Sequence, residues 1–186
     1  PDSTAEARPA GKGEVQAGND WRPIAASPLQ ARSRSSAVWT GKEMLVVGGS
    51  TQPPCPPGAD CVGPNASQLP VDGAAYNPDT DSWRTLPDAP QPVASSTATW
   101  TGQEMVLLVP GLNGYQRAAT LAFDPAADRW RELPYPPPQT YLIGGVWNGQ
   151  QIVYWQSEEA PERDDWSLDP ATGTWTKISD DPFVRT

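Results

Sequence analysis

The chain of 186 residues carries 22 Asp and Glu against 13 Lys and Arg, a formal net charge of −9. This acidic balance, with no basic stripe, argues against a nucleic acid partner, because proteins that bind phosphate backbones need clustered Lys and Arg. No apolar run approaches the roughly 20 residues of a membrane-spanning helix. The 23 Pro, 16 Gly and 9 Trp divide the chain into many short segments, which predicts an all-β protein with many turns.

Residues 1–18 consist mainly of Ala, Gly, Pro and charged residues, with almost nothing apolar. Such a segment buries too little surface to offset the entropy lost on ordering, so we expect a flexible leader here. The folded segment is expected to comprise residues 19–186.

A hairpin motif occurs three times in the expected folded segment. In each copy two short apolar runs flank a turn that contains glycine, a pattern typical of two antiparallel strands. The glycines are 61 and 47 residues apart, and we attribute the longer first interval to a loop inserted within the first unit. The three turns are Trp39-Thr40-Gly41, Trp100-Thr101-Gly102 and Trp147-Asn148-Gly149.

A second hairpin motif follows the first in every copy. An Asn or Asp before Pro starts a tight turn, since its side chain bonds the backbone ahead and Pro fixes φ for the next residue. An aromatic residue or Leu comes just before this pair. A Trp lies seven residues after that aromatic residue or Leu. Two hairpins per unit predict three units of four antiparallel strands. The motifs are Tyr76-Asn77-Pro78 with Trp83, Phe123-Asp124-Pro125 with Trp130, and Leu168-Asp169-Pro170 with Trp175.

The inserted loop of the first unit contains both cysteines, Cys55 and Cys61, among prolines. We expect a disulfide that stiffens this loop, as is typical of an exported protein. Two free thiols in a cytosolic protein are the alternative. Because the chain has no His, the two cysteines provide too few ligands for zinc, and neither a metal site nor a cofactor is expected.

The repeated units resemble kelch repeats, specifically those of bacterial exported proteins with Trp-Thr-Gly hairpins. The resemblance rests on Val47-Gly48-Gly49 ending the second strand, Tyr76-Asn77-Pro78 in the third, and the Trp of the fourth. It implies β-propeller blades around a central channel, in a secreted or cell-surface protein. The Gly-Gly pair is missing from the second and third units, which have Val109-Pro110 and Trp155-Gln156 instead. The blades are expected at about 35–86, 95–133 and 140–178.

Three blades do not close a ring, since propellers have roughly four to eight blades. Open blades would leave exposed strand edges, which favours a segment of a larger, six- or seven-bladed ring. A six-bladed dimer and an open three-bladed protein are the alternatives. Residues 19–24 resemble the last strand of a blade whose other strands are elsewhere, and residues 181–184 resemble the approach to a fourth blade. The expected partner within a ring is a second propeller half, from the same or another chain.

Candidate binding residues lie in and near three loops, at residues 50–72, 110–118 and 156–165, that the propeller topology places on one face. Polar, aromatic and Arg side chains there suit a sugar or a carboxylate. The Trp residues at recurring positions are expected to pack between blades. We expect an acidic run at residues 158–165 to be solvated, with a calcium site as the alternative. The candidate ligand-binding residues are Arg32, Arg34, Asn113, Tyr115, Arg117, Tyr141 and Trp155.

These features favour a secreted binding or scaffold module that recognises a glycan or a protein partner through its loop face. No catalytic residue is assigned. The alternative is an enzyme on a kelch propeller, of the carbohydrate-oxidase or sugar-mutarotase type, with part of its active site outside this chain. The copper oxidases of this kind need His ligands, which this chain lacks. A mutarotase-type site needs an Arg and an acid near the channel, for which Arg32, Arg34 and Arg117 are candidates.

Overall fold

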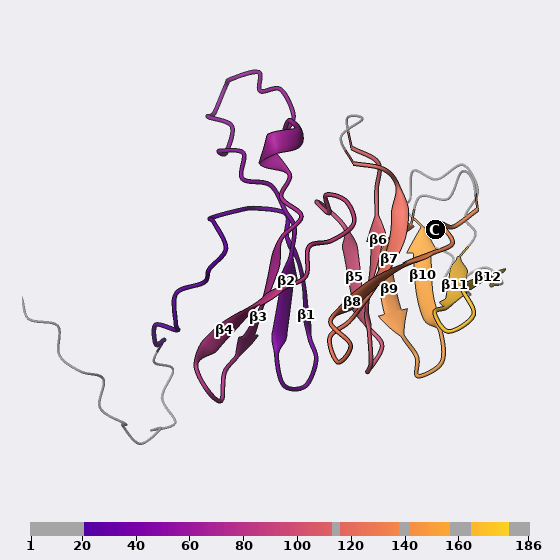
Figure 1. Cartoon of the computed structure of the whole chain (residues 1–186). Helices are drawn as coiled ribbons and strands as arrows, with labels where there is room; N and C mark the ends of the chain where they lie inside the picture. The colour runs from indigo at the N-terminus through magenta and orange to yellow at the C-terminus, as the bar shows by residue number, and fades with distance from the viewer. Residues whose placement is uncertain (1–20, 113–115, 138–141, 157–164, 179–186) are drawn as a thin grey trace, which may run out of the picture.

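A computed structural model describes residues 21–112, 116–137, 142–156 and 165–178. These residues form three four-stranded antiparallel sheets and one short 3-10 turn, η1 (Ala66–Gln68). The prediction of an all-β fold built from four-stranded propeller blades is therefore confirmed (Figure 1). No helix within the described ranges has the length and apolar character of a membrane span.

The three blades follow one another along the chain, and within each blade the strands pair in sequence order. Blade 1 contains β1 (Ser36–Trp39), β2 (Met44–Val47), β3 (Gly73–Asn77) and β4 (Ser82–Leu86). Blade 2 contains β5 (Thr97–Trp100), β6 (Met105–Val109), β7 (Ala119–Asp124) and β8 (Arg129–Leu133). Blade 3 contains β9 (Leu142–Trp147), β10 (Ile152–Gln156), β11 (Trp166–Asp169) and β12 (Thr174–Lys177).

The Trp-Thr-Gly hairpins turn at the lower face of the blades, as Figure 1 is drawn. The Thr40 hydroxyl accepts hydrogen bonds from the backbone N–H groups of Lys42 and Glu43, at 3.2 and 2.9 Å. Gly41 has φ of +95°, a left-handed conformation that Gly adopts without steric cost. Thr101 and Asn148 accept the equivalent bonds in the other blades. Local sequence therefore determines these turns.

The second hairpin of each blade also turns at the lower face, and a side chain begins each turn as predicted. Asn77 Oδ1 accepts the backbone N–H of Asp79 at 2.9 Å. Asp124 and Asp169 accept the corresponding N–H groups at 2.8 and 2.9 Å. In each turn, one residue with a positive φ leads the chain into the fourth strand. These residues are Asp81, Asp128 and Gly173.

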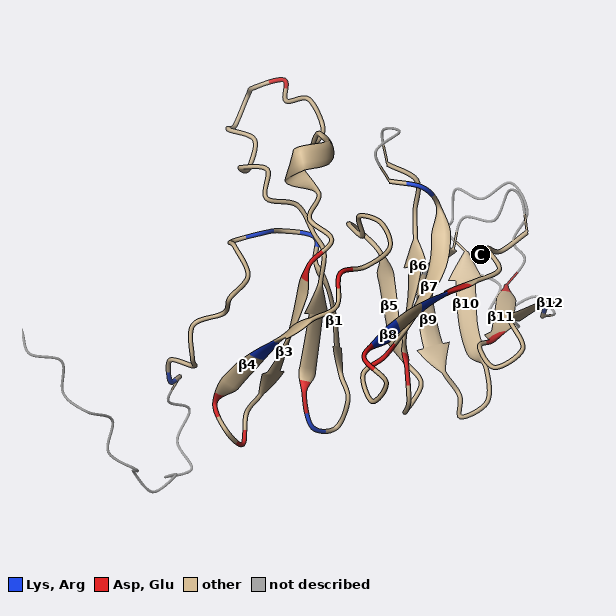
Figure 2. Ribbon diagram, in the orientation of Figure 1, with Lys and Arg blue, Asp and Glu red and all other residues tan. Residues whose placement is uncertain are grey.

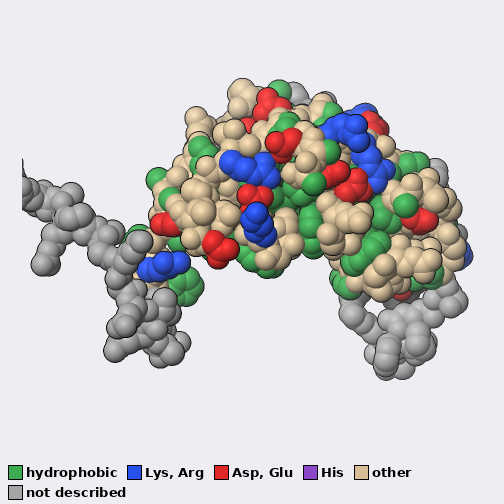
Figure 3. Space-filling model, turned by 60° about the horizontal axis from the view of Figure 1, so that its bottom comes forward, with side chains coloured by type: hydrophobic (Ala, Val, Ile, Leu, Met, Phe, Trp, Pro, Cys, Tyr) green, Lys and Arg blue, Asp and Glu red, His purple; other side chains and the backbone are tan. Residues whose placement is uncertain are grey.

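The innermost strands of the three blades lie side by side. β1 contacts β5, and β5 contacts β9, while the other strands of each blade extend outward in order. Ser36 Oγ donates to the Ser96 carbonyl at 3.1 Å, and Thr99 Oγ1 donates to the Gly145 carbonyl at 3.2 Å, so side chains also join these strands. The blades together form an arch (Figure 3).

The hydrophobic core lies between the blades. On β6 of the middle blade, Met105, Leu107 and Val109 pack toward blade 1, whereas Val106 and Leu108 pack toward blade 3. All five side chains are buried, because this blade has a neighbour on each side. The sheets therefore stack face to face through alternating positions of each strand.

The fourth-strand Trp residues join neighbouring blades at their outer strands. Trp130 packs on Phe123, with ring centroids 4.9 Å apart, and lies against the core between blades 1 and 2. Its indole N–H donates to the carbonyl of Pro87, directly after β4, at 2.9 Å. Trp175 makes the same bond to Pro134 at 2.8 Å. The prediction that recurring Trp residues pack between blades is confirmed at both internal interfaces.

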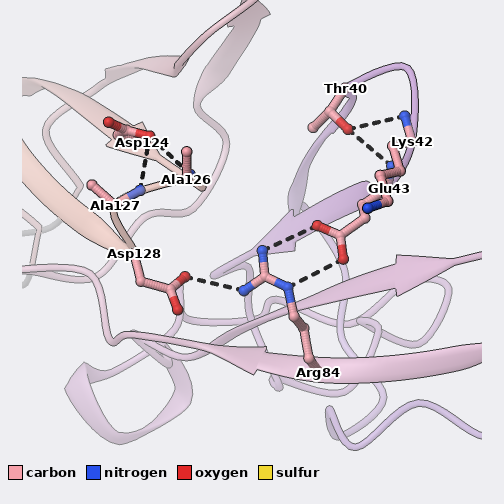
Figure 4. Close-up of polar contacts among 8 residues, drawn as sticks. All are labelled: Thr40, Lys42, Glu43, Arg84, Asp124, Ala126, Ala127 and Asp128. Carbon is pink, nitrogen blue, oxygen red and sulfur yellow. Dashed lines mark hydrogen bonds and ion pairs between the residues drawn. The ribbon is translucent and has the colours of Figure 1, made fainter.

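Arginines on β4 and β8, at the blue segments of these strands in Figure 2, link neighbouring blades through their side chains. Arg84 donates to the Glu43 carboxylate of its own blade, at 3.2 and 3.1 Å, and to Asp128 of blade 2 at 3.0 Å (Figure 4). The hydrogen bonds to Glu43 are the main reason that the pKa of Arg84 is raised. Blade 2 repeats the arrangement, since Arg131 pairs with Glu104 and donates to the Pro170 carbonyl of blade 3 at 2.8 Å.

Candidate binding site on the upper face

The upper face carries the β2–β3 loops and the connections between blades. The longest described loop, residues 48–72 of blade 1, rises above the sheets in Figure 1 and contains η1. The predicted disulfide between Cys55 and Cys61 is present, with a Cα–Cα distance of 5.9 Å. Backbone and side-chain bonds fold the loop onto itself, from Thr51 N–H to the Gln68 carbonyl at 2.9 Å and from Gln52 Nε2 to the Val62 carbonyl at 2.7 Å.

A cavity of about 450 Å³ lies between this disulfide loop and the segment that leads into β1. Polar groups from both sides line it, together with the disulfide and several prolines. A second cavity, of about 640 Å³, adjoins it and shares the lining residues Gln52, Cys61, Val62, Gly63 and Pro64. The polar lining residues of the first cavity are Ser33, Arg34, Ser50, Gln52 and the acidic Asp60.

Arg34 stands at the edge of this cavity in an unusual backbone conformation. Its φ is +58°, in the left-handed region that residues with side chains rarely adopt. Ser95, at the equivalent position of blade 2, has the same φ, and its N–H donates to the Arg34 carbonyl at 3.1 Å. Arg34 is exposed, and no carboxylate among the described residues lies within ion-pair distance of its guanidinium. It is therefore available to a ligand.

Arg32 is placed differently, because its side chain is only 6% exposed. The guanidinium donates to both carboxylate oxygens of Asp72, at 2.6 and 3.0 Å, and to the Gly48 carbonyl at 3.2 Å. The hydrogen bonds from Arg32 are the largest cause of the lowered pKa of Asp72. Arg32 thus ties the two ends of the long loop together, and its donors are committed to the protein.

Arg117 is paired with Glu132 of β8, at 2.8 and 3.0 Å, and both side chains are more than half exposed. Its neighbour Gln116 is 3% exposed and was not among the candidates. Gln116 Oε1 accepts the Ala94 N–H at 2.6 Å, while Nε2 donates to the Ala94 and Pro110 carbonyls. This side chain joins the blade 2 loop to the connection between blades 1 and 2.

Trp155 lies on the lateral face of blade 3. It is 42% exposed, and its ring covers Gly144, where a Cβ would overlap the ring. The strand pairings show that Trp155 in blade 3 is equivalent to Leu108 in blade 2. Leu108 faces the next blade along the chain, so Trp155 lies on the face of blade 3 that points away from blade 2. The structure therefore does not bring Trp155 to the cavity beside Arg34.

The remaining candidates, Asn113, Tyr115 and Tyr141, lie outside the described residues, as do the leader, residues 158–164 of the acidic run, and residues 181–184. Within the described ranges, no group of three or more His, Cys, Asp or Glu is arranged to hold a metal ion. Sequence reasoning missed Ser33, Ser50 and Gln52, although the polar run after Gly48-Gly49 was a usable signal.

The fold and the site define a set of β-propeller blades with a polar cavity on the loop face. No family model and no curated protein matches the chain. A solved structure, described as "Structure of YjhT", matches with a TM-score of 0.60 at 19% sequence identity. The match covers 88% of this chain and 56% of that chain, so this chain spans little more than half the length of that structure. At this identity the likeness shows the fold alone.

Proposed function

We propose that the chain is a kelch-type propeller binding module of an exported protein, which recognises an anionic group of a glycan or protein partner beside Arg34. The observation that carries the proposal is the exposed side chain of Arg34 at the edge of the cavity, which has no carboxylate of the described residues within ion-pair distance. The left-handed backbone recurs at Ser95 of blade 2, so it belongs to the geometry of the blades, and the proposal rests on the side chain.

The cavity lining has the chemistry for an anionic group with neighbouring polar atoms. The planar guanidinium can donate two parallel hydrogen bonds to a carboxylate. Ser33 adds a hydroxyl group to the cavity wall, and Gln52 adds an amide oxygen, because its Nε2 already donates to the Val62 carbonyl. Since the chain has a net charge of −9, much of its surface disfavours anions, so an arginine that pairs with no carboxylate of the described residues is a selective contact.

Export is supported by the disulfide Cys55–Cys61, because such bonds persist mainly in oxidising compartments. A measurement of free thiols in the protein isolated from its natural source tests this part of the proposal. We expect none to react without reduction. Two reactive thiols would contradict export.

Binding is tested with arrays of glycans and peptides, using the wild-type protein and Arg34→Gly. Gly accepts the left-handed φ, so this variant should remain as stable as the wild type or gain about 1 kcal/mol. Loss of a charge-assisted contact should weaken binding by more than about tenfold. Lys42→Ala is the matched control, because it removes one positive charge from the exposed lower face.

Unchanged binding by Arg34→Gly, or equal loss with Lys42→Ala, would refute the role of Arg34. Absence of binding to every array member, with turnover of a glycan in solution, would favour the enzyme alternative. A drop in stability with Arg34→Gly would show that the arginine serves the fold.

A further inference from the structure

Residues 21–25 lie outside the three sheets and are held against blade 1. The indole N–H of Trp83 donates to the Ala25 carbonyl at 2.9 Å. The N–H of Ala25 donates in turn to Asp81 Oδ1, also at 2.9 Å. The segment is therefore fixed at the outer part of the blade by two bonds that span more than fifty residues of sequence.

The contact with Trp83 is the same as the one found at both internal interfaces. Trp130 donates to Pro87 and Trp175 to Pro134, at 2.9 and 2.8 Å. In both cases the accepting carbonyl belongs to the residue that follows the fourth strand of the preceding blade, since β4 ends at Leu86 and β8 at Leu133. Ala25 thus occupies the place of a residue directly after a fourth strand.

The sequence of the segment agrees with this placement. Trp21-Arg22-Pro23-Ile24-Ala25 matches Trp83-Arg84-Thr85-Leu86-Pro87 and Trp130-Arg131-Glu132-Leu133-Pro134, position by position, at Trp, Arg and the Ile or Leu. The charges agree as well. Arg22 helps to lower the pKa of Asp81, after the larger effects of the bonds from Ala25 and Tyr76, and Arg84 pairs with the equivalent Asp128.

Blade 1 is covered by this segment only at its outer part. Tyr76 is buried and Trp83 is partly buried, whereas Trp39 on the innermost strand is 51% exposed. The equivalent Trp100 and Trp147 pack against the cores between blades. Trp21 itself is fully exposed, so the far side of the segment is also uncovered.

We propose that residues 21–24 are the fourth strand of a further blade, whose three inner strands form a separate antiparallel sheet that docks on the Trp39 face of blade 1. The interface continues the pattern of the two internal ones, with apolar side chains against Trp39 and strand pairing along residues 21–24. The occupant is therefore a three-stranded sheet with a free edge on its third strand.

A second copy of this chain does not fit this place. In a six-bladed dimer, blade 3 of one copy would precede blade 1 of the other. Blade 3 already has a fourth strand, β12, whose Trp175 is equivalent to Trp21. Residues 21–24 of each copy would then be a surplus strand, because β12 of the other copy already fills the fourth-strand position.

A fusion protein tests the proposal directly. A second copy of residues 95–128 replaces residues 1–19, so that Asp128 of the copy is followed by Asp20. The copied strands then precede residues 21–24 as β5, β6 and β7 precede β8. We expect hydrogen exchange at the backbone amides of Arg22 and Ile24, on either side of Pro23, to slow by at least about tenfold relative to the 186-residue chain. Acrylamide should quench the fluorescence of Trp39 less in the fusion than in the parent chain, because the added sheet covers this side chain. The contribution of Trp39 is obtained in each protein as the difference from its Trp39→Phe variant.

The matched control inserts one Gly between the copy and Asp20. A shift of one residue turns every side chain of the strand to the opposite face, so protection should be lost. Equal exchange in the fusion, the control and the parent would overturn the proposal. A dimer of the parent chain with residues 21–24 protected would overturn it as well.

A second measurement does not depend on folding of the fusion. Trp83→Phe in the parent chain removes the indole donor and retains a ring against Tyr76. Exchange of the Ala25 N–H should quicken by about fivefold, as expected for the loss of a hydrogen bond worth about 1 kcal/mol. Unchanged exchange would show that Trp83 does not hold the segment and would refute the equivalence with Trp130 and Trp175.

Discussion

The substitution Asp72→Asn tests the bond that closes the long upper loop of blade 1. Arg32 donates to both oxygens of the Asp72 carboxylate from a side chain that is 6% exposed. Asn keeps the shape of Asp but replaces one acceptor oxygen with an amino group that faces the guanidinium. One hydrogen bond is therefore lost, and the buried charge of Arg32 loses its counter-charge.

The magnitude follows from the burial of the two partners. Breaking a buried ion pair by removal of one partner costs about 3–5 kcal/mol. The cost here is smaller, because 46% of the Asp72 side chain is exposed and water screens the pair. A lost hydrogen bond to a charged group costs about 1.5–3 kcal/mol. We therefore expect Asp72→Asn to lower the free energy of unfolding by about 2 kcal/mol at neutral pH.

The pH dependence of this difference has a definite sign. Hydrogen bonding to Arg32 lowers the pKa of Asp72 in the folded protein below its usual value of 3.8. The stabilisation is therefore fully present above pH 3.8 and is lost as the pH falls through the lower folded-state pKa. The difference between wild type and Asp72→Asn should be constant near neutrality and shrink only in acid.

Urea unfolding, followed by tryptophan fluorescence between pH 7 and pH 3, measures both quantities. Asp88→Asn is the matched control, because Asp88 is exposed, follows β4 and forms no ion pair with the described residues. A loss below about 0.5 kcal/mol for Asp72→Asn, or one equal to that of the control, would refute the assignment of Arg32 to the fold.

Two further predictions concern the packing and the lower face. Gly48→Ala should lower stability by at least about 3 kcal/mol, because Gly48 has φ of +61° and a Cβ would overlap the Val93 carbonyl. Gly41→Ala, left-handed but in open space, should cost only about 1 kcal/mol, and equal costs in urea unfolding would contradict this reading. A double-mutant cycle of Arg84→Met and Glu43→Gln should give a coupling of about 0.5–1 kcal/mol, since both side chains are partly exposed. That coupling should decline in 1 M NaCl, and a salt-independent value would argue against an electrostatic origin.

The strands and turns were predictable because their causes are local. Thr40 and Asn77 bond to backbone groups two or three residues away, and Gly41 supplies the left-handed turn. The disulfide was predictable from two cysteines in one short loop. The loop face followed from the order of the strands.

The roles of individual arginines were not predictable in the same way. Arg32 was a ligand candidate, yet its partner Asp72 is 40 residues away, and nothing local indicates the pairing. The left-handed backbone of Arg34 depends on contacts between blades, including the bond from Ser95. The bridge from Arg84 had a signal, because Trp-Arg recurs on the fourth strand while Glu recurs in the first hairpin.

The contrast between the two faces has a consequence for how such a protein can diversify. The lower face joins blades through Arg84 and its equivalents, so a change of length there would break contacts between blades. On the upper face, blade 1 spans residues 48–72 where blade 2 spans residues 110–118. Closing the longer loop costs only about 1 kcal/mol more in chain entropy. Selection can therefore lengthen and exchange upper loops almost independently of the scaffold, much as an antibody varies its loops.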